Sequence, residues 1–454
     1  MRTRRLSEIA AVLRGNLEGP DVVVSSVEVD SRRVRPGGLF VAMRGERDDG
    51  HGYVVDAFAA GAVAAIVRAD WPATPGPTVR VGDTEGVLLR LAAEERGAMK
   101  AIVVGITGAN GKTSTKDLAA ATLGTRLRTH ASPASFNNEV GVPLTILGAP
   151  EGTEALVLEM GARRVGDVEL LSRLARPAVV VVTNVGVAHM EVFGSWDAIV
   201  RSAAEPVAAL GPDGVAVLNA DDPVVRGLRP RTRARTVLFG TSEDADVRAQ
   251  DVRLDDHGRA SFSLAVGGQS EPVALGVPGG HMVSNALAAV AAATSVGMTL
   301  AECSAGLKGA SVSAWRMETF TSDDGLVIVN DAYNANPESM AAGLKAARWI
   351  ARRTRLIAVL GPMAELGSEA LEEHERLGDL AVRLRVDRLI AVGEDARPIA
   401  MAAIRQGSGP DDVIMVDTPD EASDAVRAWA AAGDVVFVKG SRVAGLERVA
   451  EALR

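Results

Sequence analysis

Short apolar runs alternate with helical patterns along most of this chain. Residues 101–106, 155–158, 178–182 and 214–218 are rich in Val, Leu, Ile and Ala, without the alternation of a half-exposed strand. Continuous runs of this kind are typical of parallel strands covered by helices on both faces. Residues 237–275 are strand-rich and predict an antiparallel extension of the same sheet.

The pattern changes on either side of this central segment. The first 97 residues mix short strands and helices, whereas the last third repeats the central pattern. A length of 454 residues fits about three domains. We therefore predict an α/β protein with a small α/β domain at 1–97, a central parallel-sheet domain at 98–312 and a second α/β domain at 313–454. Strands are expected at residues 22–29, 39–42, 326–329, 356–360, 388–392, 413–416 and 435–438, and helices at 1–14, 85–96, 113–123 and 284–295.

Composition narrows the class of protein. The net charge is −9, whereas a nucleic-acid-binding protein usually has a basic surplus, so we expect no nucleic-acid partner. Cys303 is the only cysteine, which excludes an internal disulfide and a cysteine-ligated zinc site and fits a reducing cytoplasm. No apolar stretch reaches about 18 residues, so we expect no membrane insertion.

The most informative motif is a glycine-rich loop between an expected strand and an expected helix, Gly105-Ile-Thr-Gly-Ala-Asn-Gly-Lys-Thr-Ser114. Backbone N–H groups in such a loop, with the positive end of the helix, suit phosphate groups. Lys112 can reach the β- and γ-phosphates, and the Thr113 hydroxyl can bind Mg²⁺. Gly105 lies one residue too early for the strict P-loop spacing. The alternative is an ordinary strand-to-helix turn.

Several blocks of this chain resemble those of one enzyme family. The variant Thr107-Gly-Ala-Asn-Gly-Lys-Thr113 resembles the nucleotide loop of the Mur ligases and their folylpolyglutamate synthase relatives. Further similar blocks follow in order through all three expected domains: Asp30-Ser-Arg32, residues 45–51 and 136–143, Glu159-Met-Gly-Ala162, residues 184–189 and 218–222, Asn330-Asp-Ala-Tyr-Asn-Ala-Asn-Pro337, residues 359–367 and Lys439-Gly-Ser-Arg442. The resemblance implies a UDP-substrate domain, a central P-loop ATPase domain and a Rossmann-like C-terminal domain.

The resemblance also implies a reaction. We expect an ATP-dependent amide-bond ligase that uses ATP and Mg²⁺ and acts as a cytoplasmic monomer in peptidoglycan precursor synthesis. Its expected substrates are UDP-N-acetylmuramoyl-tripeptide and D-alanyl-D-alanine, joined through an acyl phosphate. The third residue of the tripeptide, lysine or diaminopimelate, is left open. Two alternatives also stay open: a diverged paralogue with another peptide acceptor, and a nucleotide-binding protein that has lost catalysis.

The resemblance assigns roles to particular residues. Lys112, Glu159 and His189 are the expected catalytic residues, and Thr113, Glu159 and His189 the expected Mg²⁺ ligands. The expected nucleotide contacts are Thr107, Gly108, Ala109, Asn110, Gly111, Lys112, Thr113, Ser114, Asn285, Arg316 and Asp331. The expected substrate contacts are Ser31, Arg32, Asp48, His51, Asn137, Asn138, Tyr333, Asn334, Asn336 and Lys439. Of these, the resemblance implies that Lys439 approaches the carboxylate of the acceptor dipeptide.

Each assignment has a structural alternative. Glu159 and His189 follow buried strands, where open α/β sheets bind ligands, but a carboxylate there can cap a helix and a lone histidine can be structural. Arg316 can form a surface salt bridge. The amide side chains in the two substrate loops, Asn137, Asn138, Asn334 and Asn336, suit peptide recognition and turn formation equally. Ser31, Arg32, Asp48 and His51 can belong to solvated turns.

One departure from the family concerns the helix after His189. The family usually has a carbamoylated lysine two residues before a glutamate, and Ala203 stands there, two residues before Glu205. Ala203 can supply no metal ligand. We therefore predict weaker binding of a second Mg²⁺.

Overall fold

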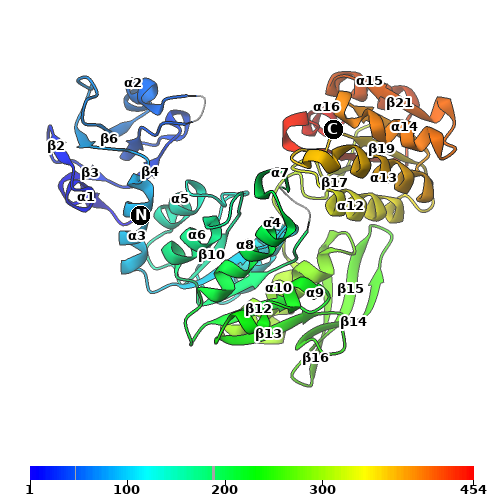
Figure 1. Ribbon diagram of the computed structural model, residues 1–454, viewed down its shortest axis with the longest axis horizontal. Helices are drawn as coiled ribbons and strands as arrows, with labels where there is room; N and C mark the ends of the chain where they lie inside the picture. The colour runs from blue at the N-terminus through cyan, green and yellow to red at the C-terminus, as the bar shows by residue number, and fades with distance from the viewer. Residues whose placement is uncertain (46–47, 187–189) are drawn as a thin grey trace. The chain divides into compact units, whose positions relative to one another are not determined.

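The computed structural model describes residues 1–45, 48–186 and 190–454. Contacts divide the chain into two compact units. One contains residues 1–105, 127–161 and 167–178, and the other contains residues 106–126, 162–166 and 179–454. The described part has no helix long and apolar enough to cross a membrane. Figure 1 shows the elements in chain order.

The N-terminal residues form a five-stranded sheet in the order β2-β7-β6-β5-β4. Its strands are β2 (Asn16–Glu18), β4 (Ser26–Glu28), β5 (Gly38–Val41), β6 (Ala62–Arg68) and β7 (Thr78–Val81). The helices here are α1 (Leu6–Leu13), α2 (Val54–Ala59) and α3 (Val87–Ala98). Strands β4 to β7 pair in parallel, while β2 is an antiparallel edge.

The strand expected at residues 22–29 is in fact two strands. Strand β3 (Val23–Val24) pairs antiparallel with β1 (Arg4–Arg5), while β4 pairs with β5. Between them, the Ser25 N–H donates to the Gly37 carbonyl at 2.9 Å, which bends the chain from one partner to the other. A tertiary hydrogen bond therefore splits a segment that the residue pattern made continuous.

The central sheet has nine strands in the order β16-β15-β14-β13-β12-β11-β8-β10-β9. These are β8 (Ile102–Thr107), β9 (Thr129–Ala131), β10 (Ala155–Glu159), β11 (Val179–Val182), β12 (Val215–Asn219), β13 (Arg235–Gly240), β14 (Val247–Leu254), β15 (Arg259–Val266) and β16 (Gln269–Pro278). Strands β11 to β14 pair in parallel and β14 to β16 antiparallel, so the expected antiparallel extension is confirmed.

Eight helices of the described chain accompany this sheet: α4 (Lys112–Leu123), α5 (Gly141–Gly148), α6 (Asp167–Ala175), α7 (Met190–Phe193), α8 (Trp196–Ala208), α9 (Pro223–Arg226), α10 (Met282–Ser295) and α11 (Leu300–Lys308). The alanine-rich α10 is almost wholly buried and packs against α4. Helix α11 also packs on α4, where a Cβ on Gly306 would lie 2.6 Å from the Thr122 Cα. Cys303 of α11 is fully buried.

The C-terminal sheet has six strands in the order β17-β18-β22-β19-β20-β21, all parallel except β17. They are β17 (Glu318–Thr321), β18 (Val327–Asn330), β19 (Leu356–Leu360), β20 (Arg388–Val392), β21 (Val413–Val416) and β22 (Val435–Lys439). The helices are α12 (Pro337–Ile350), α13 (Ala370–Arg383), α14 (Arg397–Arg405), α15 (Pro419–Trp429) and α16 (Glu447–Ala452). In Figure 1, α12 and α13 lie on one side of this sheet and α15 and α16 on the other. Both α/β expectations, of a central sheet and of a second one, are confirmed.

Candidate active site

The glycine-rich loop joins β8 to α4, as the sequence predicts. Gly108 has φ +133° and Gly111 has φ +77°, a region that residues with a side chain rarely adopt. A Cβ at Gly108 would overlap the Thr183 hydroxyl, and one at Gly111 would overlap the Asn285 side-chain amide. Both glycines are therefore required by backbone conformation and by space.

Asn184, the second residue after β11, fixes this loop. Its carbonyl accepts the Ala109 N–H at 3.0 Å, and its side-chain oxygen accepts the Asn110 N–H at 2.7 Å. These two amides are therefore engaged within the protein. The N–H groups of the first turn of α4 lack intrahelical partners, as at any helix start, and they are the candidates for phosphate binding.

Lys112 folds over the loop that precedes it. Its ammonium donates to the Gly108 carbonyl at 2.6 Å and to the Ala109 carbonyl at 3.1 Å. The positive charge thus stays above the loop where phosphate groups would lie. Thr113, only 3% exposed, accepts a hydrogen bond from Arg316 Nη2 at 3.2 Å.

Arg316 reaches the loop from the segment that enters the C-terminal sheet. Its guanidinium lies 4.2 Å from the centre of the Tyr333 ring. Its Nε is buried and has no hydrogen-bond partner among the described residues. Trp315 and Met317, on either side, have φ values of +60° and +55°. Such a conformation persists only where surrounding contacts hold it, and it is commonest at functional sites.

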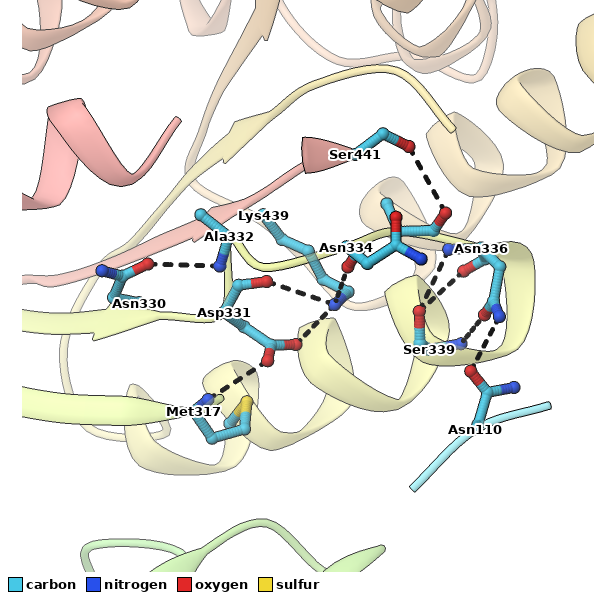
Figure 2. A network of polar contacts seen from close by, with 11 residues as sticks. Asn110, Met317, Asn330, Asp331, Ala332, Asn334, Asn336, Ser339, Lys439 and Ser441 are labelled. Atoms are coloured by element: carbon cyan, nitrogen blue, oxygen red, sulfur yellow. Dashed lines mark hydrogen bonds and ion pairs between the residues drawn. The ribbon is translucent and has the colours of Figure 1, made fainter. Parts of the chain in front are cut away.

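Figure 2 shows the polar network behind this segment. The Asp331 carboxylate accepts the Met317 N–H at 3.1 Å and the Lys439 ammonium at 2.6 Å. Asn336 caps α12 and also donates its side-chain amide to the Asn110 side chain at 2.7 Å. Arg316, just before β17, and Asn336, the cap of α12, therefore both contact the glycine-rich loop.

Glu159 ends β10 and is only 1% exposed. One carboxylate oxygen accepts the Asn137 side-chain amide at 2.7 Å. The other oxygen is buried without a hydrogen-bond partner among the described residues. A buried anionic oxygen left in this state suits a cation such as Mg²⁺. This single oxygen therefore suits the expected metal.

The third expected Mg²⁺ ligand is His189. His189 lies outside the described residues. Among the residues that are described, no cluster of three acidic, histidine or cysteine side chains could hold a metal ion. The structure thus describes Glu159 and Thr113 separately. A metal site that combines them stays a prediction.

The N-terminal candidates mostly contact one another. Arg32, which is exposed, donates to the Asp30 carboxylate at 2.8 Å and so lowers the Asp30 pKa to about 2. His51 is buried: its Nε2 accepts the Arg68 N–H at 3.0 Å, and its Nδ1 contacts Asp49 at 2.6 Å. Both ring nitrogens of His51 therefore have protein partners. Ser31 begins the short 3₁₀ helix Ser31–Arg33, and Asp48 is exposed.

Other candidates have contacts that fit their structural alternatives. Asn138 accepts the Gly141 N–H at 2.8 Å and so stabilises the start of α5. The Asn334 carbonyl accepts the Lys439 ammonium at 2.9 Å. Asn285 donates to Met282 Sδ at 3.4 Å. None of these contacts tests binding of a substrate or nucleotide.

Sequence reasoning missed two further features. Asn184 was seen only as part of a block, although its place just after a buried strand is a signal for a role at the sheet edge. The second is Asp117 of α4, whose carboxylate accepts the Ser313 N–H at 2.7 Å and the Ser313 hydroxyl at 2.8 Å. This contact ties the loop's helix to the segment that carries Arg316. No local sequence pattern announces it.

Helix α8 carries the departure at Ala203. Ala203 packs against an apolar cluster that includes Val180, Val182 and Leu218. Two residues later, the Glu205 carboxylate accepts the Gly166 N–H at 2.6 Å. The methyl group is thus partly buried against this cluster.

Packing against Thr183 and Asn285 explains why the loop needs its two glycines. The start of α4 and the Lys112 ammonium above the loop suit a phosphate group. A glycine-rich loop between a strand and a helix, contacted by an arginine and an amide from outside the loop, is the arrangement of a P-loop nucleotide-binding protein.

Comparisons with known proteins identify the family. Residues 23–94 match the Mur ligase family, catalytic domain; residues 106–293 match the Mur ligase middle domain; and residues 315–442 match the Mur ligase, glutamate ligase domain. The chain belongs to the Mur ligase family of ATP-dependent amide-bond ligases. The expected family, fold class and class of enzyme are thereby confirmed.

Similar proteins cover nearly the whole chain. A UDP-N-acetylmuramoyl-tripeptide–D-alanyl-D-alanine ligase of Mycobacterium tuberculosis is 42% identical over 95% of this chain and 92% of its own length. The enzyme of that name from Bacillus subtilis is 35% identical over 100% of this chain and 99% of its own length. Among solved structures, MurF from Acinetobacter baumannii has a TM-score of 0.87 and 29% sequence identity. The match covers 100% of this chain and 99% of that structure. MurF ligase from Thermotoga maritima, in complex with ADP, has a TM-score of 0.81 and 30% sequence identity. The match covers 95% of this chain and 97% of that structure.

Proposed function

We propose that this chain joins D-alanyl-D-alanine to UDP-N-acetylmuramoyl-tripeptide at the expense of ATP. The observation that carries the proposal is the 42% identity to a ligase of that name along 95% of the chain. The tripeptide carboxylate attacks the γ-phosphorus of ATP, so that ADP leaves and an acyl phosphate forms. The dipeptide amine then attacks the acyl carbon, and inorganic phosphate leaves.

The chain's own residues would bind and orient the nucleotide. The first-turn N–H groups of α4 and the Lys112 ammonium would hold the β- and γ-phosphates and balance their charge. Asn285 and Asp331 would contact the nucleoside, and Arg316 would reach it from the C-terminal sheet. The T. maritima relative with bound ADP supports nucleotide binding by this fold.

Mg²⁺ would be held by the Thr113 hydroxyl and by Glu159, together with His189. When bound, the ion would screen the phosphates and stabilise charge that develops during transfer. The support is the buried Glu159 oxygen without a partner among the described residues. Asn137 would act by holding the other oxygen of Glu159, and so orient the carboxylate.

The UDP-linked substrate is expected at the N-terminal sheet, around Ser31, Arg32 and Asp48. His51 would stabilise the fold of this region and not contact the substrate itself, because both of its ring nitrogens have protein partners. Tyr333, Asn334 and Asn138 are the proposed peptide contacts. We further propose that the chain acts in the cytoplasm as a monomer.

Phosphate release tests the proposal. The enzyme is given ATP, Mg²⁺ and UDP-N-acetylmuramoyl-tripeptide containing lysine or diaminopimelate, with and without D-alanyl-D-alanine. Sustained release, and a product with the mass of the joined substrates, should require all components. Turnover only with another peptide acceptor would support a diverged paralogue. ADP binding without any turnover would support a protein that has lost catalysis.

A further inference from the structure

A buried lysine outside the nucleotide loop lies at the centre of the network in Figure 2. Lys439 ends β22 and its side chain is only 2% exposed. Its ammonium donates to the Asp331 carboxylate at 2.6 Å, the Asn334 carbonyl at 2.9 Å and the Asp331 carbonyl at 3.3 Å. An ammonium has three N–H donors, so these three acceptors match its full capacity.

The charge of this lysine is stabilised locally. Burial lowers the pKa of Lys439, and the neighbouring Asp331 carboxylate opposes that effect. Removing one partner of a buried ion pair leaves the other charge without compensation. The pair therefore holds the turn from Asp331 to Asn334 firmly at the carboxyl end of β18.

One arm of the network leads from this turn to Arg316. The Asp331 oxygen that does not face Lys439 accepts the Met317 N–H at 3.1 Å. Met317 and Trp315 both have positive φ, which is unfavourable for residues with a side chain. The hydrogen bond to Asp331 is one of the contacts that keep this conformation. Arg316, between the two, can therefore point at Thr113.

The other arm leads to the loop itself. The turn that Lys439 holds continues to Asn336, which caps α12 and donates to the Asn110 side chain at 2.7 Å. Asn336 thus continues the segment that Lys439 anchors, and Arg316 is linked to that segment through the hydrogen bond from Met317 to Asp331.

We propose that Lys439 is a positioning residue for the nucleotide. Through Asp331 and the Asn334 carbonyl it keeps Arg316 and Asn336 aligned with the glycine-rich loop, and it does not itself touch a substrate. This inference rests on the proposed function. It differs from the role that the family resemblance implies, in which Lys439 approaches the carboxylate of the acceptor dipeptide.

The two roles predict different kinetics for Lys439→Met. A positioning role predicts a higher KM for ATP, a lower kcat and weaker ADP binding. The loss in kcat/KM for ATP should be on the order of 10²-fold, as when a reacting group is misplaced by about 1 Å. The KM for D-alanyl-D-alanine should change by less than about twofold. Lys345→Met, at an exposed lysine of α12, is the matched control and should leave all these values unchanged.

A double variant tests whether Lys439 acts through Arg316. If it does, Arg316→Met combined with Lys439→Met should lie within about tenfold of the worse single variant, far from the product of the two losses. Losses that are multiplicative both with Arg316→Met and, in a second double variant, with Asn336→Ala would overturn the proposal. An effect confined to the KM for D-alanyl-D-alanine would also overturn it. If Lys439→Met does not fold, Lys439→Gln serves instead, because its amide can still donate to Asp331. ADP binding is measured without ligation, so a failure of the proposed reaction would be recognised separately.

Discussion

Single charges determine how the loop before α4 can hold a nucleotide. Lys112 donates to two backbone carbonyls, which are neutral acceptors. Hydrogen bonds to an ionised acceptor such as phosphate are stronger than those to a carbonyl. The side chain is therefore placed to exchange its loop carbonyls for phosphate oxygens with little movement.

Lys112→Ala should remove this charge from the transferring phosphate. Loss of one such electrostatic contact commonly lowers kcat on the order of 10²–10³-fold. The fold should persist, because the lysine lies at the first position of α4 and is only half-buried. Steady-state phosphate release measures the effect, with Lys100→Ala, at an exposed lysine before β8, as the control. Normal turnover of Lys112→Ala would contradict the assignment of this loop.

The candidate site was predictable from sequence where its residues are contiguous. Lys112 and Thr113 belong to one motif between a strand and a helix, and a local pattern identifies them. The partners of Glu159 and Asp331 are different, because Asn137 is 22 residues from Glu159 and Lys439 is 108 residues from Asp331. Such pairs depend on which strands become neighbours, and a single sequence does not encode that locally.

At the scale of elements, apolar runs predicted most strands of the central and C-terminal sheets, because a buried parallel strand needs little else. Strand β6, which is also apolar and buried, was not among the expected strands. Strand β17 was missed because its sequence, Glu318-Thr-Phe-Thr321, is mostly polar and partly exposed. It forms as an antiparallel edge beside β18. The split of the expected strand at 22–29 has a similar origin, since the hydrogen bond from Ser25 is made to a distant turn.

Helix α8 carries a prediction of its own at Ala203. Because this methyl group can bind no metal and cannot be carbamoylated, activity should need high Mg²⁺ and be indifferent to bicarbonate. Ala203→Lys should lower the Mg²⁺ concentration needed for half-maximal activity when bicarbonate is present. Ala203→Met has similar bulk without an amine and should give no such gain. A wild-type enzyme that is stimulated by bicarbonate and saturates at low Mg²⁺ would disprove this interpretation.

At the scale of the whole molecule, the expected division into residues 1–97, 98–312 and 313–454 assigns UDP to the first domain and ADP to the second and third. Hydrogen exchange can test it, because a bound ligand suppresses local opening where it binds. ADP with Mg²⁺ should slow exchange in residues 107–116 and 313–336. UDP should slow it only near residues 25–53.

AMP, which lacks the β-phosphate, is the matched control for ADP. It should protect residues 107–116 less than ADP does, since that loop is expected to bind the β- and γ-phosphates. Protection of residues 107–116 by UDP, or of the N-terminal sheet by ADP, would show that the ligands are assigned to the wrong regions.

The packing of α11 on α4 makes the rate of chemical modification of Cys303 a measure of how often α11 detaches. Burial raises the pKa of Cys303 to about 12, so only ~1 thiol in 10⁴ is ionised at pH 8, and the thiolate is the reactive form. A disulfide reagent should therefore modify native protein only as fast as α11 detaches, and unfolded protein at once. Because the chain has a single cysteine, one absorbance trace reports that event alone. Slower modification with ADP bound would mean that the nucleotide holds α11 against α4. Rapid modification of the native protein would show that packing on α4 does not protect Cys303.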